Sequence, residues 1–248
     1  MNINYSNYKK FHPADIMVCS IARMIEDHEK VFHGVSSHLP MVAMKLAKAM
    51  HAPEAVLLNI PGGVNSLSSR LSKYSSAGDE LWNNSEAVFP LEKIFDLSMR
   101  GELDIAFLSG VQFDKYGNVN ASVIGEYHKP KVRLPGGAGS AVLIPTVKKA
   151  IIWRSKHDIK TFVEHVDFVT TRGNIFKIVT PLCIFGYRVS RLFLESVSPL
   201  SSMEEIQNHT GFSLDYNDFN IIKLPTPEEM RILNRIDPHG VRYSEFEK

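Results

Sequence analysis

The chain has 248 residues, with 28 lysines and arginines against 27 aspartates and glutamates. This length fits one large α/β domain or two small ones, and 44% hydrophobic with 22% charged residues excludes a disordered or collagen-like chain. A formal net charge of +1 gives no electrostatic footprint for nucleic acid or an anionic membrane, so we expect neither as a partner.

The first half of the sequence alternates helical and strand patterns. Pro40 is well placed to open a helix, Gly101 suits a helix C-cap, and residues 61–84 are rich in Gly, Ser and Asn, which is typical of a long functional loop. The alternation predicts an α/β fold with an open, mostly parallel sheet and helices on both faces. Apolar spacing predicts helices at 15–27, 41–50 and 91–99, and strands at 30–35, 55–59 and 104–109.

The second half of the sequence is richer in strands. A short helix at 203–209 has Ser201 or Ser202 as N-cap, and a terminal helix at 227–235 has Thr226. No repeat or linker interrupts the chain, so we expect a single domain over residues 1–248, elaborated with extra strands in its second half. Those strands are expected at 150–154, 166–170, 176–180 and 187–196.

The small number of cysteines indicates which cellular compartment and which metal sites to expect. Only 2 cysteines are present, too few for a disulfide framework or a zinc site. Residues 1–8 lack the apolar stretch of a secretion signal, and no apolar run approaches a membrane span. We therefore expect a cytoplasmic protein with no metal.

A glycine-rich loop is the most unusual segment. Gly136, Gly137, Ala138 and Gly139 leave the backbone N–H groups open to a ligand. Such a loop can hold a phosphate, or the oxyanion that forms when a thioester is attacked; the alternative is a flexible surface turn. Its spacing is neither that of a dinucleotide-binding fingerprint nor that of a P-loop.

Two further side chains are candidates for binding. Gln112 follows a buried strand, at the carboxyl end where open α/β sheets bind ligands. His38 lies in a strand-to-helix loop, where a helix N-terminus could favour an anion; the alternative is a capping loop with Ser36 or Ser37 as the cap. Asp114, Asn118 and Asn120 are expected to form turn-stabilising hydrogen bonds.

Several motifs together resemble one known family. Residues 109–120 (SGVQFDKYGNVN) are similar to the G-x-Q-x-D-x-Y-G-N-x-N signature of family I CoA-transferases, and residues 124–130 (IGEYHKP) followed by the glycine loop keep the same order. The pattern resembles beta subunits of the glutaconate CoA-transferase type, and the beta subunit of the steroid-ring-degrading CoA hydrolase is also similar.

The resemblance implies a specific architecture and chemistry. It implies an open α/β fold, an obligate alpha-subunit partner in an αβ pair or a dimer of such pairs, and an active site between the two chains. The substrate is an acyl-CoA thioester, with no tightly bound cofactor. A beta-chain glutamate at the end of the second strand attacks the thioester, and the loop Gly136–Gly139 supplies oxyanion-hole amides.

The sequence departs from this pattern at the nucleophile. Asn59 stands where the glutamate would fall, and asparagine cannot form the covalent intermediate. No catalytic residue is therefore assigned in this chain. The amide of Asn59 can donate and accept hydrogen bonds, so its expected role is to position other groups. We expect a CoA-thioester hydrolase or ring-opening subunit; a true CoA-transferase subunit and a non-catalytic partner- or ligand-binding subunit are the alternatives.

Overall fold

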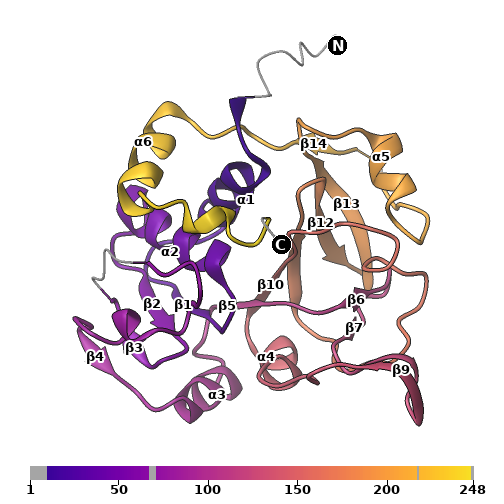
Figure 1. Cartoon of the computed structure of the whole chain (residues 1–248), viewed down its shortest axis with the longest axis horizontal. Helices are drawn as coiled ribbons and strands as arrows, with labels where there is room; N and C mark the ends of the chain where they lie inside the picture. The colour runs from indigo at the N-terminus through magenta and orange to yellow at the C-terminus, as the bar shows by residue number, and fades with distance from the viewer. Residues whose placement is uncertain (1–9, 67–70, 217, 247–248) are drawn as a thin grey trace. The chain divides into compact units, whose positions relative to one another are not determined.

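The computed structural model describes residues 10–66, 71–216 and 218–246, which leaves part of the expected loop at 61–84, and the N-terminal residues 1–8, outside it. The chain forms two compact units (Figure 1). The first unit comprises residues 9–107 and 223–248, and the second unit comprises residues 108–222. The C-terminal residues thus return to the unit that the N-terminal half builds. The expected single domain over residues 1–248 stays a prediction.

Parallel strands form the centre of the first unit. β1 (Lys30–His33) lies between β2 (Val56–Asn59) and β5 (Ile105–Leu108) and is parallel to both. Beyond β2, the short strands β3 (Gly63–Val64) and β4 (Ala87–Val88) pair in antiparallel fashion. The register places His33 opposite Asn59, so both residues end their strands at the same edge.

Helices complete the first unit, and their observed ends can be compared with those predicted from the sequence. The predicted cap of the terminal helix is confirmed, since Thr226 Oγ1 accepts from the N–H of Glu229. α2 begins at His38, earlier than the predicted residue 41, and Gly101 follows α3 with a φ of +71°. The helices are α1 (Pro13–Ala22), α2 (His38–Met50), α3 (Glu92–Met99) and α6 (Pro227–Ile236), with 3₁₀ turns η2 (Asp79–Leu81) and η3 (Val241–Tyr243).

The second unit is built mainly from strands. β10 (Lys149–Trp153) and β11 (Ile175–Val179) are parallel, and β12 (Cys183–Arg188) and β13 (Arg191–Val197) continue in antiparallel fashion to β14 (Asn220–Ile221), which runs parallel to β13. The single strand predicted at 187–196 is wrong, because the chain reverses at Val189 and Ser190, both with positive φ. The strand predicted at 166–170 is also wrong, since those residues form no named strand.

Smaller elements surround this sheet. Asp114 holds a turn between β6 and β7 by accepting from the N–H groups of Tyr116 and Asn118, which confirms its predicted turn role. The mixed sheets and helices of the two units confirm the α/β class and the extra strands of the second half. The remaining elements are β6 (Gln112–Phe113), β7 (Val119–Asn120), β8 (Val123–Glu126), β9 (Lys129–Arg133), α4 (Ser140–Thr146) and α5 (Met203–Asn208).

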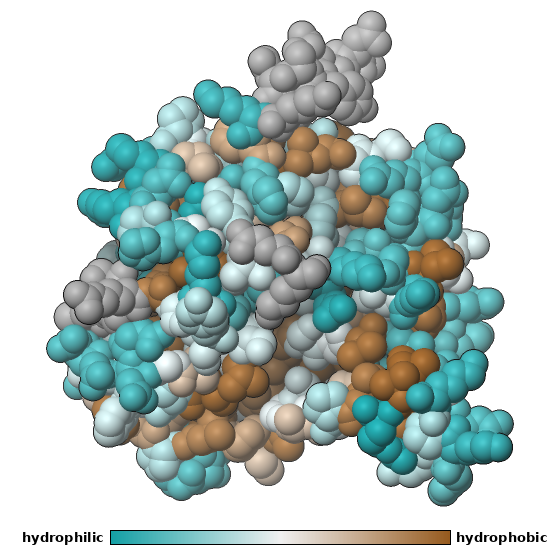
Figure 2. Space-filling view, viewed as in Figure 1, coloured by the Kyte–Doolittle hydropathy of each residue, from teal (hydrophilic) through white to brown (hydrophobic). Residues whose placement is uncertain are grey.

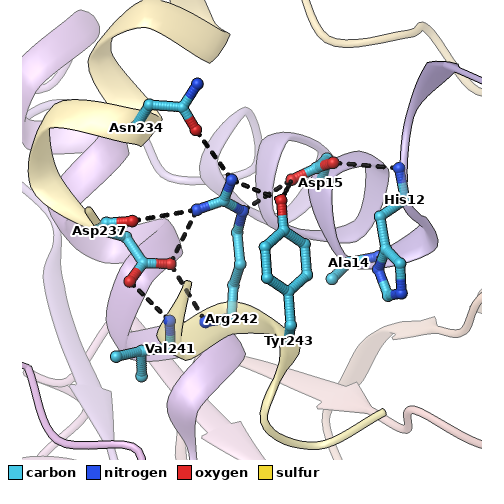
Figure 3. A network of polar contacts seen from close by, with 8 residues as sticks. All are labelled: His12, Ala14, Asp15, Asn234, Asp237, Val241, Arg242 and Tyr243. Carbon is cyan, nitrogen blue, oxygen red and sulfur yellow. Dashed lines mark hydrogen bonds and ion pairs between the residues drawn. The ribbon is translucent and has the colours of Figure 1, made fainter. Parts of the chain in front are cut away.

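A buried ionic network ties the C-terminal segment to α1 within the first unit (Figure 3). Arg242 is 3% exposed, and its guanidinium donates to Asp15 at 2.7 Å, to Asp237 at 2.9 Å and to Asn234 at 2.9 Å. The hydroxyl of Tyr243 also donates to Asp15 at 3.0 Å. Arg242 and Tyr243 are thereby bonded to a residue of α1 that lies more than 200 positions earlier in the sequence.

A second buried polar cluster lies in the second unit. His157 Nε2 is 3.0 Å from Thr210 Oγ1, and Nδ1 is 2.9 Å from Thr180 Oγ1. The Thr210 hydroxyl donates to the carbonyl of Ile206 and the Thr180 hydroxyl donates to the carbonyl of Cys183, so each ring nitrogen faces a hydroxyl oxygen that is itself bonded to the backbone. Burial lowers the pKa of His157 to about 3 and raises that of the nearby Cys183 thiol to about 12.

The surface mixes hydrophilic and hydrophobic residues, as Figure 2 shows for one face. Exposed apolar side chains are normal for a folded protein. Across the described ranges, no helix has the length and apolarity needed to cross a bilayer.

Candidate functional site

A pocket in the first unit opens beside the carboxyl ends of β1 and β2. His33 and Asn59, the last residues of these strands, contribute polar groups, and α2 contributes a lysine and two methionines. This is the edge of a parallel sheet at which α/β proteins bind ligands. The pocket is lined by His33, Met41, Met44, Lys45, Leu57, Leu58, Asn59, Ser66 and Leu81.

The side chain of Asn59 is bonded to two backbone groups in this pocket. Its Nδ2 donates to the carbonyl of Leu81 at 2.7 Å, and its Oδ1 accepts from the N–H of Gly63 at 2.8 Å. A Cβ on Gly63 would lie 2.9 Å from Asn59 Nδ2 and 2.3 Å from the carbonyl oxygen of Leu81, so a glycine is needed for this approach. The amide therefore holds the strand end against the following loop.

His33 was not identified from the sequence. Its side chain is 3% exposed, and Nδ1 lies 3.1 Å from the carbonyl of Gly34, so Nδ1 carries the proton and Nε2 is an acceptor. Burial lowers its pKa to about 4, and the charges of Lys45 and His38 act in the same direction. The ring is therefore neutral at neutral pH. The predicted strand at 30–35 runs past His33, and only the pairing of β1 with β2 shows that it ends its strand opposite Asn59.

Lys45 supplies the positive charge of the pocket lining. Its ammonium donates to the carbonyl of Ser66 at 2.9 Å, and burial lowers its pKa. The lining thus combines a cation, a neutral imidazole and an amide with apolar side chains. Such a lining can orient a polar group of a ligand while shielding it from water, but it holds no carboxylate for nucleophilic attack.

His38 lies at the N-terminus of α2 and is 2% exposed. Glu245 Oε1 accepts both from its backbone N–H at 2.9 Å and from its Nδ1 at 3.2 Å. Ser37, one of the two serines predicted as the cap, is the N-cap residue, but its side chain makes no cap bond because its hydroxyl donates to the carbonyl of Val35. A carboxylate from the C-terminal segment stabilises the helix N-terminus instead.

The glycine loop lies in the second unit, just before α4. The N–H of Gly136 is bonded to the carbonyl of Ala121 at 2.8 Å, whereas those of Gly137, Ala138 and Gly139 have no partner among the described residues. Gly136 has a φ of +92° and Ala138 one of +41°, a left-handed conformation that is rare outside glycine. Three N–H groups therefore remain to bind an anion.

Gln112 is buried in the second unit. Its Oε1 accepts from Asn120 Nδ2 at 2.7 Å and from the N–H of Asp167 at 3.1 Å, and its Nε2 donates to Asp167 Oδ2 at 3.3 Å. Ala121, next in the chain to Asn120, holds the N–H of Gly136. Gln112 and the glycine loop are thus anchored on the same short segment.

The structure divides the candidate residues between the two units. Asn59 and His38 belong to the first, and Gln112 and residues 136–139 belong to the second. Among the described residues, no group of three or more His, Cys, Asp or Glu side chains could hold a metal ion.

Comparisons with known proteins agree on one family. The family model "Coenzyme A transferase" matches residues 16–205. The B-type subunit of the glutaconate CoA-transferase of Acidaminococcus fermentans is 29% identical, covering 95% of both chains. The cholesterol ring-cleaving hydrolase IpdB subunit of Mycobacterium tuberculosis is 23% identical, covering 94% of this chain and 98% of its own.

A solved structure matches the fold closely. A chain of the decarboxylase AibA/AibB superposes with a TM-score of 0.88 at 28% identity, covering 93% of this chain and 97% of its own. The family match spans most of the sequence, including the pocket residues of the first unit and the glycine loop of the second. The chain belongs to the coenzyme A transferase family.

Proposed function

We propose that this chain is the beta subunit of a heteromeric enzyme that hydrolyses an acyl-CoA thioester or opens an acyl-CoA ring, without a covalent glutamyl intermediate. The observation that carries this proposal is the state of Asn59. Both polar atoms of its amide are engaged, by Leu81 and Gly63, and it has no carboxylate to attack a thioester. The similarity to a subunit named as a ring-cleaving hydrolase also favours hydrolysis or ring opening.

The oxyanion of this reaction has a donor set in the glycine loop. The N–H groups of Gly137, Ala138 and Gly139 have no partner within the described part of the chain, and they lie in a loop held by the bond from Gly136 to Ala121. Preorganised backbone donors of this kind stabilise the charge that develops on an attacked carbonyl oxygen. Within the first unit, His33, Asn59 and Lys45 give the pocket polar groups.

A true CoA-transferase is the second candidate. It is favoured by the identity to a glutaconate CoA-transferase chain over almost the whole sequence. In that case the nucleophilic carboxylate would come from the partner chain, because the pocket lining of this one has none.

One assay on the assembled enzyme separates these activities. The chain is co-expressed with an alpha-type partner chain, and four products are followed for a panel of acyl-CoAs, with and without an acceptor acid: free CoA, ring-opened acyl-CoA, the CoA thioester of the acceptor, and CO₂. We expect CoA release or ring opening that does not depend on the acceptor. Turnover that requires the acceptor would establish the transferase instead, and CO₂ release would establish a decarboxylase.

Crowding the glycine loop should impair catalysis. A Cβ on Gly137 would lie 2.7 Å from Ala141 Cβ and 2.9 Å from Thr170 Cγ2, so Gly137→Ala displaces the loop donors. We expect kcat to fall by about 10²-fold with little change in KM, because a misplaced oxyanion donor acts on the transition state.

The control substitution is Gly173→Ala, which crowds Pro145 and Ile144 at the other end of α4 without touching the loop. Wild-type kcat in a folded Gly137→Ala enzyme, or an equal loss in both variants, would remove the loop from the mechanism.

A further inference from the structure

We propose that His38 and Glu245 form a carboxylate–imidazole dyad, in which His38 Nε2 is the general base for the water that attacks the acyl-CoA thioester. This inference rests on the proposed hydrolytic function and supplies the base that Asn59 cannot be. Glu245 is the positioning residue of the dyad, and His38 is its catalytic residue.

The hydrogen bonds define the protonation of the ring. A carboxylate only accepts hydrogen bonds, so the contact of 3.2 Å between Glu245 Oε1 and His38 Nδ1 requires a proton on Nδ1. The same oxygen accepts from the His38 backbone N–H at 2.9 Å, which fixes the carboxylate. Nε2 is left with its lone pair, the arrangement that a general base needs.

The other ring nitrogen, Nε2, has no hydrogen-bond partner within the described part of the chain. It is buried and has no hydrogen bond among the described residues, whereas both ring nitrogens of the buried His157 are bonded. Leaving such an atom unpaired is costly, so it calls for a hydrogen-bonding group that the described residues do not supply. A water molecule poised for attack provides that group.

The ring lies on the helix face that forms the pocket. His38, Met41 and Lys45 follow the i, i+3, i+7 spacing of one face of α2, and Met41 and Lys45 line the pocket. The dyad therefore lies one helical turn before Met41, on the side of α2 that lines the pocket.

The C-terminal network explains how Glu245 reaches α2. Arg242 is bonded to Asp15 of α1 and to Asp237, and η3 packs against both α1 and α2 (Figure 3). This fixes the chain three residues before Glu245, whose side chain is 11% exposed. A network of buried charges thus supports the carboxylate that contacts His38.

The chemical step balances without a further reactant. A water oxygen attacks the thioester carbonyl carbon while one water proton passes to His38 Nε2, and Glu245 stabilises the imidazolium that forms. The C–S bond then breaks, and the leaving CoA thiolate takes the proton back from Nε2. The products are the free carboxylic acid and CoA, with His38 neutral again.

Kinetics of the assembled enzyme test the dyad. General-base catalysis contributes about 10²–10⁴-fold, so His38→Gln should lower kcat by at least 10²-fold with KM nearly unchanged. Glu245→Gln keeps an accepting oxygen but loses the charge, and should lower kcat by less. The matched control is His51→Gln at the other end of α2, where Nε2 is bonded to the carbonyl of Ile25; wild-type kinetics are expected.

A spectroscopic measurement keeps the test valid if a variant fails to fold. In the enzyme with ¹⁵N-histidine in this chain, the His38 ring should show the Nδ1–H tautomer, and a non-hydrolysable thioether analogue of the acyl-CoA should shift its Nε2 resonance. An Nε2–H tautomer, or an Nε2 resonance that the analogue leaves unmoved, would overturn the dyad.

The outcomes separate the two proposals. Acceptor-independent CoA release by the wild type, retained within threefold in His38→Gln, would overturn the dyad and leave the hydrolytic function standing. Transfer of CoA to an acceptor acid, without release of free CoA, would overturn the proposed function, and with it the role of His38 as a base for water. A loss of kcat in His38→Gln and Glu245→Gln, with wild-type kinetics in His51→Gln, supports both the dyad and the hydrolytic function.

Discussion

Replacing Arg242 by methionine is expected to lower the free energy of unfolding by about 3–5 kcal/mol, the cost of breaking a buried ion pair from one side. The guanidinium is bonded to Asp15 at 2.7 Å and to Asp237 at 2.9 Å, with side chains at most 5% exposed. Burial by itself lowers the pKa of Arg242, but the bonds to Asp15 and Asp237 outweigh it and raise the pKa. Its removal leaves two buried carboxylates without their cation.

Urea denaturation of the Arg242→Met and wild-type proteins measures this loss. The matched control is Arg231→Met, whose side chain is 65% exposed and lies 3.9 Å from Glu228 on the surface of α6. Such surface pairs contribute about 0–1 kcal/mol. Equal stability of the two variants would show that the network around Arg242 does not hold the C-terminal segment.

Acid should destabilise the protein well before most carboxylates are protonated. The pKa of His157 is lowered from 6.5 to about 3, with burial as the main cause. The unfolded chain therefore binds a proton below pH 6.5 that the folded chain refuses, so stability is fully present above pH 6.5 and falls as the pH drops toward 3. His157 alone accounts for a loss on the order of 4 kcal/mol.

Urea midpoints measured from pH 8 down to pH 4 check this dependence. His157→Gln should be less stable at pH 8, because it disturbs the bonds to Thr180 and Thr210, but its stability should fall less steeply below pH 6.5. His128→Gln, which changes an exposed histidine, should keep the wild-type slope. An unchanged slope in His157→Gln would show that this ring is not a source of acid sensitivity. His33, with a pKa of about 4, adds to the slope that remains.

The elements predicted well are those whose signals lie within a few residues. The terminal helix was recognised from Thr226 and Pro227, and the structure adds a full capping box with Glu229. Gly101 takes the left-handed conformation expected after a helix. β2 and β5 were recognised as short apolar runs, because strands buried on both faces have few polar positions.

The errors arise where the decisive partner is distant or the turn residues are unusual. The start of α2 was misplaced because its N-terminus is capped by Glu245, which is 207 residues away in the sequence. The hairpin between β12 and β13 was missed because Val189 and Ser190 occupy positive φ without the Asn-Gly pattern of such turns.

The candidate site shows the same contrast between residues with local sequence signals and residues that depend on distant partners. Asn59 could be placed from the end of an apolar strand, and the glycine loop from its composition. His33 required the register of β1 against β2, since only that pairing brings it beside Asn59. Glu245 required the return of the C-terminal segment to the first unit, which no local pattern encodes.

The bond between Asp15 and Arg242, which joins positions 227 residues apart, has a consequence for biosynthesis. At about 5–20 residues per second, the ribosome adds Arg242 roughly 10–45 s after Asp15. Through that interval α1 and α2 lack their ionic partner and their capping carboxylate. The first unit, although it contains the earliest helices of the chain, can therefore be completed only after Arg242 and Glu245 have been synthesised.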